Sequence, residues 1–404
     1  MKLKNKEKKL KGTTEIFPLT MVKYLLIVLL FFIGTQASRS QLSILREDAD
    51  SLVKKGTDYI YNIQFDSATA CFHQVIQKYP DNPAGYFLDA MVDWWQITLY
   101  RETESIDNSF LQKIDKVLEV CDKRLQKNEY DITALFFKGG AVGYRGRFYA
   151  VREKWFKAIS DGKEGFDILV RCWQFAPGNH DIMLGTGIYN YFAVELPEKY
   201  PALKVISAFL PSGDKKIGIL QLESAAKYAR YASVEAKVVL LQIYYQWEED
   251  YPKAFNIAYE LFTKYPNNPY FERYLGRCYV CLGMRDKWEA TWRDAIEKCI
   301  QKKTGYDRVT AREALYYVGL ALMMKGDYEN SLKYFYKCDE ACRYLDNNGP
   351  SGFMVRTNLY IGQIFDKQGK RKYAVMQYEK VKSWKDYKGS VAEADRYLQK
   401  PYGK

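Results

Sequence analysis

The chain has 404 residues, of which 48% are hydrophobic and 27% are charged, and it contains only 12 prolines and 26 glycines. This composition excludes collagen, low-complexity disorder and a polytopic membrane protein, and it is typical of a water-soluble body. The length suits two or three compact domains, or one repeat array whose core grows by stacking neighbouring units. Only two histidines occur. The chain therefore has almost no histidines from which a multi-histidine metal site or a histidine relay could be built.

The amino-terminal segment has the pattern of a secretory signal. Seven lysines lie between residues 2 and 23, and an apolar run follows from Tyr24 to Ile33. The run is about half of the ~20 residues that a membrane-spanning helix needs, so a retained anchor is the alternative reading. We expect residues 1–37 to be a signal peptide, cleaved after Ala37 or after Ser40.

Export is expected whichever start codon is used, because a start at Met21 keeps the apolar run. The first cysteine is Cys71, far from the cleavage region, which argues against a lipoprotein anchor. Removal of the signal leaves a net charge of +7, with acids and bases interspersed along the chain. Such interspersed charges indicate solvated faces and no nucleic-acid partner. We expect a soluble protein that is located in the periplasm or cell envelope or is secreted. Peripheral contact with the membrane or envelope is compatible with this expectation.

A segment of roughly 34 residues recurs with small and aromatic residues at fixed offsets. The first copy begins at Ala49 and places Gly56 at offset 8 and Phe72 at offset 24; later copies begin at residues 235, 269, 312 and 355. These are the offsets of the tetratricopeptide (TPR) pattern, in which small residues let two helices approach and aromatics fill the space between them. The pattern predicts an all-α fold: a right-handed TPR-like superhelical array of about eight antiparallel helix pairs.

The repeat frame divides the chain into three regions after the signal. Residues 38–132 contain amino-terminal TPR-like repeats, 133–234 contain degenerate central helical repeats with glycine-rich blocks, and 235–404 contain the carboxy-terminal TPR repeats. Two nearly identical breakers, at 79–83 and 265–269, are expected to end one repeat and start the next.

Four central blocks carry a resemblance to a known family: Gly139–Arg147, Trp155–Gly162, Gly185–Tyr191 and Phe209–Gly218. They resemble bacterial exported TPR proteins and, more distantly, the TPR-39 and inclusion-body-clearance family of eukaryotes, in which a Gly-Asp-Lys/Arg turn follows a proline-containing helix end. The resemblance implies a helical scaffold without enzyme activity or cofactor. The export signal departs from the eukaryotic members, so their intracellular roles do not transfer.

The first glycine block is not typical of a phosphate-binding loop, because it follows no strand and lacks a Gly-Lys-Ser/Thr ending. In the centre we expect helices over 134–144 and 149–175, with Gly140 and Phe156 on TPR-like offsets. Arg145 and Arg147 then lie at a helix end, where they cap carbonyls or, alternatively, clamp an anion or carboxylate in the groove.

Other chemical motifs are weak. Asp214 is expected to cap the helix that follows it. Cys278 and Cys281 have the spacing of a zinc or redox pair, but no second ligand pair or nearby histidine accompanies them. No serine elbow or metalloprotease helix occurs. We expect no metal, no cofactor and no enzyme.

The inner face of a TPR array presents offsets 2, 5, 9 and 12, and these positions give the candidate partner-binding residues. They are Tyr270, Arg273, Arg277, Tyr316 and Gln363. Arginine, tyrosine and amide groups suit peptide carboxylates and backbone groups. The predicted function is a non-enzymatic exported scaffold that binds a protein or peptide partner in its concave groove, in cell-envelope assembly or maintenance. The competing interpretation of Arg273 and Arg277 is pairing with carboxylates of the neighbouring repeat.

The alternative function is a carrier or membrane-surface protein that holds an apolar or lipid-like ligand among central aromatic residues. These aromatics are Trp94, Trp95, Tyr189, Tyr191, Phe192 and Phe209.

Overall fold

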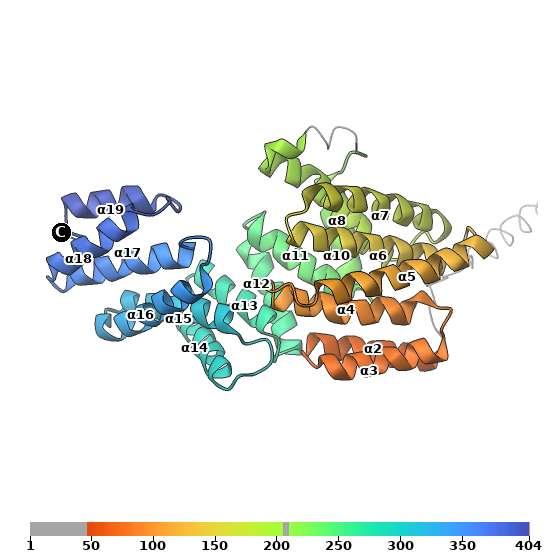
Figure 1. Cartoon of the computed structure of the whole chain (residues 1–404), viewed down its shortest axis with the longest axis horizontal. Coiled ribbons are helices and arrows are strands. Elements are labelled where there is room, and N and C mark those ends of the chain that lie inside the picture. The colour runs from red at the N-terminus through yellow and green to blue at the C-terminus, as the bar shows by residue number, and fades with distance from the viewer. Residues whose placement is uncertain (1–46, 205–209, 404) are drawn as a thin grey trace, which may run out of the picture. The chain divides into compact units, whose positions relative to one another are not determined.

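The computed structural model describes residues 47–204 and 210–403, which belong to one compact unit. Within these ranges the chain forms seventeen α-helices, one short 3-10 helix and no strand (Figure 1). The all-α prediction is confirmed. The expected signal, residues 1–37, lies outside the described residues. No helix in the described part of the chain is long and apolar enough to cross a membrane.

Consecutive helices pack as pairs, and each pair packs on the next. The eight pairs are α2 (Glu47–Tyr61) with α3 (Phe65–Lys78), α4 (Pro83–Leu99) with α5 (Asp107–Lys127), α6 (Ile132–Val151) with α7 (Trp155–Phe175), α8 (Ile182–Lys199) with α10 (Lys215–Tyr228), α11 (Ser233–Gln246) with α12 (Tyr251–Lys264), α13 (Pro269–Cys281) with α14 (Arg285–Ile300), α15 (Arg308–Lys325) with α16 (Tyr328–Leu345), and α17 (Gly352–Lys367) with α18 (Arg371–Lys382). The 3-10 helix η1 (Pro201–Leu203) follows α8, and α19 (Ser390–Gln399) packs on the last pair.

Small residues and rings meet inside the pairs as the repeat pattern predicts. A Cβ atom added to Gly276 would lie 2.7 Å from the Trp292 ring, and one added to Gly319 would lie 2.8 Å from the Phe335 ring. Such a distance is far below van der Waals contact. The same contact joins two further glycine–aromatic pairs, Gly56 with Phe72 and Gly362 with Tyr378. In all four pairs, the glycine of the first helix therefore accommodates the ring of the second.

Local capping explains where several helices begin and end. Asn82 and Asn268 each accept a hydrogen bond from the backbone N–H two residues on, and a proline follows each at the first helical position. Both breakers thus start a new pair as predicted. Asp214 accepts a hydrogen bond from the N–H of Ile217, which confirms its expected role as the cap of α10. Gly326 ends α15 in the left-handed conformation, at φ 82°.

The central pair α6–α7 departs from the predicted frame. Helix α6 continues to Val151, so Arg145 and Arg147 lie inside the helix and cap no helix end. Gly140 faces the Phe87 ring of α4 instead of α7, and Phe156 is 77% exposed. The assumed offsets were wrong here because glycine against backbone, and not glycine against a ring, brings α6 and α7 together. A Cβ on Gly165 of α7 would lie 3.0 Å from the backbone nitrogen of Gly143.

The first two pairs also contact the fifth and sixth pairs and the loop after α14, far along the sequence. The Asn268 side chain donates a hydrogen bond to the Tyr61 carbonyl at 3.0 Å, and Tyr265 donates to Asp58 at 2.9 Å. The N–H of Gly305, between α14 and α15, donates to the Tyr100 hydroxyl. Figure 1 shows α4 beside α12 and α13 accordingly. The array therefore turns back on itself and encloses the side chains on its inner face.

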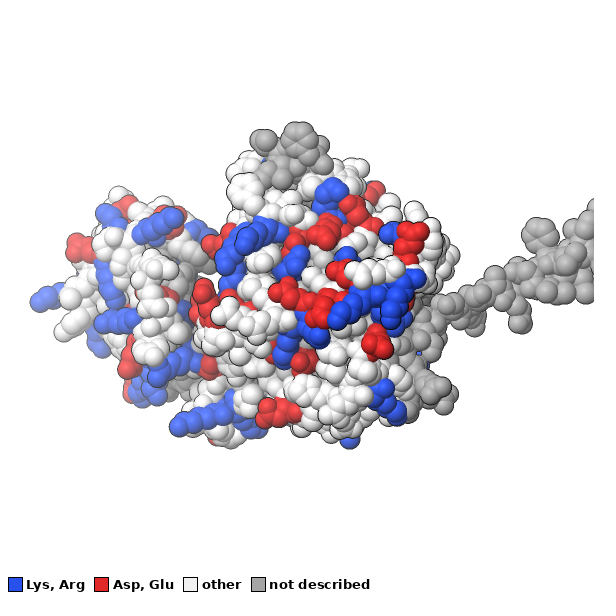
Figure 2. Space-filling model, turned by 45° about the vertical axis from the view of Figure 1, so that its right-hand side comes forward, with Lys and Arg blue, Asp and Glu red and all other residues white. Residues whose placement is uncertain are grey.

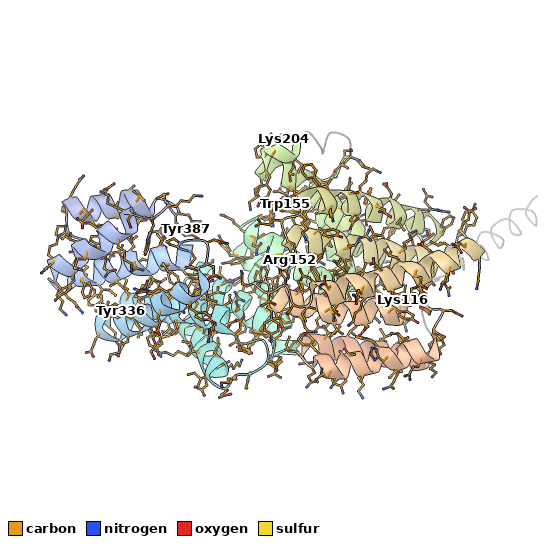
Figure 3. All side chains as sticks on the ribbon, in the orientation of Figure 1. Lys116, Arg152, Trp155, Lys204, Tyr336 and Tyr387 are labelled. Carbon is orange, nitrogen blue, oxygen red and sulfur yellow. The ribbon has the colours of Figure 1, made fainter. Side chains whose placement is uncertain are left out.

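An arginine fixes the connection between α6 and α7. Arg152, labelled in Figure 3, makes two hydrogen bonds to the Asp107 carboxylate, at 2.7 and 2.8 Å, from the turn after α6. It also donates to the carbonyls of Arg101 and Thr103. Bidentate pairing with a carboxylate gives directional as well as electrostatic stabilisation. This contact anchors one edge of the enclosed space.

Candidate functional site

A groove of about 610 Å³ lies along the inner face of the array. Its walls come mainly from the first helices of successive pairs, α4, α6, α8, α11 and α13, with one side of α7. First helices face inward in a helical-repeat array, so this is the concave surface on which the sequence predicts binding.

Cations and aromatic rings dominate the polar and bulky groups of the groove. Its cationic residues are Arg101, Arg147, Lys199, Arg273 and Arg277, and Glu102 is the one carboxylate that lines it among the described residues. The rings are Trp94, Trp155, Tyr189, Phe192, Tyr200, Trp247, Tyr270 and Tyr274. On the face drawn in Figure 2, by contrast, basic and acidic side chains are interspersed. The groove therefore favours an anionic ligand with apolar or aromatic parts.

Arg273 and Arg277 share a carboxylate with the neighbouring pair. Arg273 Nε lies 2.8 Å from Glu313 Oε2, and Arg277 Nε lies 2.5 Å from Glu313 Oε1. Glu313, on α15, is 1% exposed. Burial opposes ionisation of Glu313, but the two guanidinium groups outweigh it and lower its pKa from 4.5 to about 2. One buried negative charge thus faces two arginines, which leaves an excess of one positive charge at this end of the groove.

Tyrosine–amide hydrogen bonds hold the wall beside these arginines. Gln242 donates to the Tyr270 hydroxyl at 2.5 Å, and Gln246 donates to the Tyr274 hydroxyl at 2.6 Å. The Tyr270 ring also contacts the Trp95 ring edge to face, with centroids 5.9 Å apart. Burial raises the pKa of Tyr270 well above its ordinary value, so this wall stays neutral.

Arg147 stands apart from the other arginines of the groove. Its guanidinium lies 4.8 Å from the centroid of the Trp94 ring and 4.9 Å from that of Tyr144. It forms no ion pair with any residue that the structure describes, and its Nη1 is shielded from solvent without a hydrogen-bond partner. Its guanidinium lacks a carboxylate of the kind that Glu313 supplies to Arg273 and Arg277. Arg147 is therefore the strongest candidate for contact with an anion.

A buried glutamate that the sequence reasoning missed joins four helices behind the groove. Glu235 of α11 is 9% exposed and accepts hydrogen bonds from Trp95 at 2.7 Å, Tyr144 at 3.0 Å and Tyr61 at 3.3 Å. The donors belong to α4, α6 and α2. The only signal in the sequence is an acidic residue next to the apolar stretch from Val238 to Ile243, because the donors are remote in the chain.

A smaller cavity of about 140 Å³ opens beside the groove. Its walls are mainly apolar, and their apolar residues from α4, α6, α7 and α8 are Phe87, Leu88, Met91, Phe136, Phe166, Leu169, Leu184 and Ile188. Helices α2 and α11 also contribute, and the carboxylates of Asp181 and Glu235 lie on the same wall. Gly143, Arg147 and Gly162 line both spaces. The inner cavity and the groove therefore adjoin at these three residues.

The structure brings together four of the seven candidate residues. Tyr270, Arg273, Arg277 and Arg147 all line the groove. The other three lie elsewhere. Arg145 pairs with Asp161 of α7 at 2.7 Å, Tyr316 packs against the rings of α16 and α17, and Gln363 is 4% exposed within α17.

The six central aromatics proposed for an apolar ligand separate in the same way. Trp94, Tyr189 and Phe192 line the groove, and Trp95 lines the inner cavity. Tyr191 is fully buried. Phe209 lies outside the residues that the structure describes.

The cysteines all lie in helices, and no disulfide joins those described. Burial raises the pKa of Cys278 to about 12, and it also raises the pKa of Cys281. Metal binding and disulfide exchange use the thiolate, which is scarce at such pKa values. This pair is therefore poorly suited to either role.

No family model and no curated protein matches the chain. Three solved structures share a helical-repeat arrangement at low identity. A tetratricopeptide repeat protein from Parabacteroides merdae is 11% identical (TM-score 0.29), with 88% of this chain and all of that chain covered. A Rap protein complexed with competence and sporulation factor is 10% identical, with a TM-score of 0.42, and the match covers 88% of this chain and 97% of that chain. Human IFIT1, as a dimer with m7Gppp-AAAA, is 13% identical, with a TM-score of 0.40, and the match covers 89% of this chain and 87% of that chain.

Proposed function

We propose that the chain is a non-enzymatic scaffold that binds a peptide segment of a protein partner in its inner groove. The observation that carries the proposal is the groove itself: about 610 Å³, lined by the first helices of successive pairs, with five cationic side chains and one carboxylate. An extended segment has regularly spaced carbonyls and side chains, which suit rows of tyrosine, amide and arginine groups.

The compartment is part of the proposal. The basic start and apolar run of residues 1–37 support export to the periplasm or cell envelope, with a role in envelope assembly or maintenance. Amino-terminal sequencing of protein from an envelope fraction tests this point. A mature start near residue 38 or 41 is expected, and an intact apolar run in membranes would contradict it.

The alternative function, a carrier for an apolar ligand, is favoured by the inner cavity. Its size limits the ligand, however. An apolar cavity of about 150 Å³ holds one benzene molecule. The 140 Å³ here therefore suits one side chain or a small ring better than a lipid chain.

Site-specific photo-cross-linking tests the proposed surface. Trp155 lines the groove at the start of α7, whereas Tyr336 on α16 is 47% exposed outside it; both are labelled in Figure 3. Each is replaced by p-benzoylphenylalanine in cells that naturally produce the protein, and adducts are mapped by mass spectrometry. We expect position 155 to link to one segment of one partner and position 336 to give no such adduct. An adduct at 336 alone, or none at 155, would overturn the groove as the binding surface.

A further inference from the structure

The helix pair α6–α7 contains two glycines that no packing contact requires. A Cβ atom added to Gly143 or to Gly162 would meet nothing within 4 Å. Both lie inside helices, where glycine is unfavourable relative to alanine because it loses more conformational freedom on folding. Their neighbour Gly146 differs, since a Cβ there would lie 3.2 Å from Ala158 O. The open space at Gly143 and Gly162 is the junction of the inner cavity with the groove.

Arg147 lines both spaces, is the one cation among the described residues of the cavity wall, and forms no ion pair with any described residue. The cavity wall also carries two carboxylates, of which Asp181 already accepts hydrogen bonds from the backbone N–H groups of Tyr231 and Ala232. The buried Glu235 on the cavity wall already accepts three hydrogen bonds from protein donors. A ligand carboxylate at the junction would therefore pair with a guanidinium that has no counter-ion among the described residues, while an apolar group enters the cavity behind it.

We propose that the inner cavity binds the last side chain of the partner segment, an apolar or aromatic residue, and that Arg147 binds its C-terminal carboxylate. This inference rests on the proposed peptide-binding function and names the part of the partner that is recognised. The cavity volume of about 140 Å³ selects one side chain, because an apolar cavity of about 150 Å³ holds one benzene molecule.

The chain end fits better than an internal acidic residue. Successive side chains of an extended peptide point to opposite sides, so an Asp next to the buried side chain points away from Arg147. The terminal carboxylate belongs to the same residue as the buried side chain and lies beside it. The larger groove then holds the preceding residues.

Calorimetric titration of the whole protein with small probes tests this geometry. N-acetyl-L-phenylalanine carries one ring and a terminal carboxylate; its amide lacks the charge, and N-acetylglycine lacks the ring. We expect the acid to bind at least tenfold more tightly than either. N-acetyl-Asp-Phe-amide, with an internal carboxylate, is expected to bind no better than the amide.

Two variants localise the effect. Gly143→Leu fills the junction and is expected to abolish binding of the acid, with a melting temperature no lower than that of the wild type. Arg147→Gln is expected to weaken binding of the acid at least fivefold and to leave binding of the amide unchanged. Lys116→Gln, which removes a cation from α5 outside the lining, serves as the control and is expected to change neither.

Several results would overturn the inference. Equal binding of acid and amide would show that Arg147 takes no carboxylate. Tighter binding of dodecanoate than of N-acetyl-L-phenylalanine would identify an acyl chain as the occupant. Loss of acid binding in Lys116→Gln, or no binding of the acid to the wild type at all, would contradict the proposed site. A cross-link from position 155 together with such a failure would leave the groove function standing and reject only the terminal anchor.

Discussion

The carboxy-terminal pairs α13–α18 and the central pair α6–α7 use glycine in opposite ways. In the former, Gly276, Gly319 and Gly362 each lie under an aromatic ring of the partner helix. In the latter, a Cβ on Gly146 or Gly165 would meet backbone, one on Gly139 would meet the Leu169 side chain, and one on Gly143 or Gly162 would meet open space. Where the repeat pattern is regular, side chains of the pair itself fill the space between its two helices. Where it degenerates, space is left next to the groove, so the irregular region holds the candidate site.

The buried charges divide along the same line. Glu313 in the carboxy-terminal region is paired with two arginines, whereas Arg147 in the centre forms no ion pair with a carboxylate among the described residues. Paired buried ions specify structure, while a charge without a partner is available to a ligand. The comparison thus predicts that changes in the first region cost stability and that changes in the second cost binding.

Removal of Glu313 should have the largest effect. Glu313→Ala leaves Arg273 and Arg277 facing each other without a counter-ion, and breaking a buried ion pair typically costs about 3–5 kcal/mol. Denaturant unfolding measures the loss. Glu340→Ala, an exposed carboxylate on α16, should change stability by less than about 0.5 kcal/mol. Equal effects of the two variants would show that the buried pair has no special structural role.

Acid should weaken the same contact. The pKa of Glu313 is about 2 in the folded chain against an ordinary value of 4.5, so its contribution is complete above pH 4.5 and is lost as the pH falls toward 2. At about 1.4 kcal/mol per pKa unit, the loss is of the order of 3 kcal/mol. The stability difference between wild type and Glu313→Gln should therefore shrink over this range in urea titrations. A difference independent of pH would contradict the lowered pKa.

Overpacking should separate the two regions directly. Gly319→Leu places a side chain where the Phe335 ring already lies 2.8 Å from the added Cβ. Overpacking of this kind typically costs about 1–3 kcal/mol. The melting temperature should fall clearly. A variant as stable as the wild type would show that the glycine–ring contact does not set the spacing of α15 and α16.

Gly143→Ala should have the smallest effect and the opposite sign. Its Cβ meets nothing within 4 Å, and alanine is favoured over glycine inside a helix by about 0.5–1 kcal/mol. We expect a small gain in the free energy of unfolding. Gly165→Ala is the matched control on α7, because its Cβ would lie 3.0 Å from backbone, and it should destabilise. A loss of stability at Gly143 would mean that the space at the junction is already filled.

The fold could be predicted from the sequence wherever a local residue pattern determines a helix boundary or a contact between paired helices. Glycine and the ring sixteen residues later identified the pairs, and Asn268 before Pro269 identified a helix start. The central pair was misplaced because no aromatic ring of α7 lies against the glycines of α6, so the TPR offsets had nothing to match. Arg145 was consequently assigned to a helix end, whereas it pairs with Asp161 inside the pair.

The candidate site could be predicted only in part. Tyr270, Arg273 and Arg277 were predicted to share one helix face, and all three line the groove; their role in binding stays a prediction. The pairing of both arginines with Glu313, about 40 residues later, and the contact of Glu235 with three early helices depend on how the array turns back. No local pattern encodes that turn. The inner cavity depends on it too, since α2, α4, α6 and α11 all contribute to its lining.

The most direct test of this account compares Gly143→Leu with Gly319→Leu in both stability and cross-linking through position 155. The account predicts a double dissociation. Gly143→Leu should keep the wild-type melting temperature and lose the partner adduct, because it fills the space at the junction. Gly319→Leu should melt earlier, yet its folded fraction should keep the adduct. If Gly143→Leu retains the adduct, or loses it only by unfolding, the open space in the centre is not the binding site.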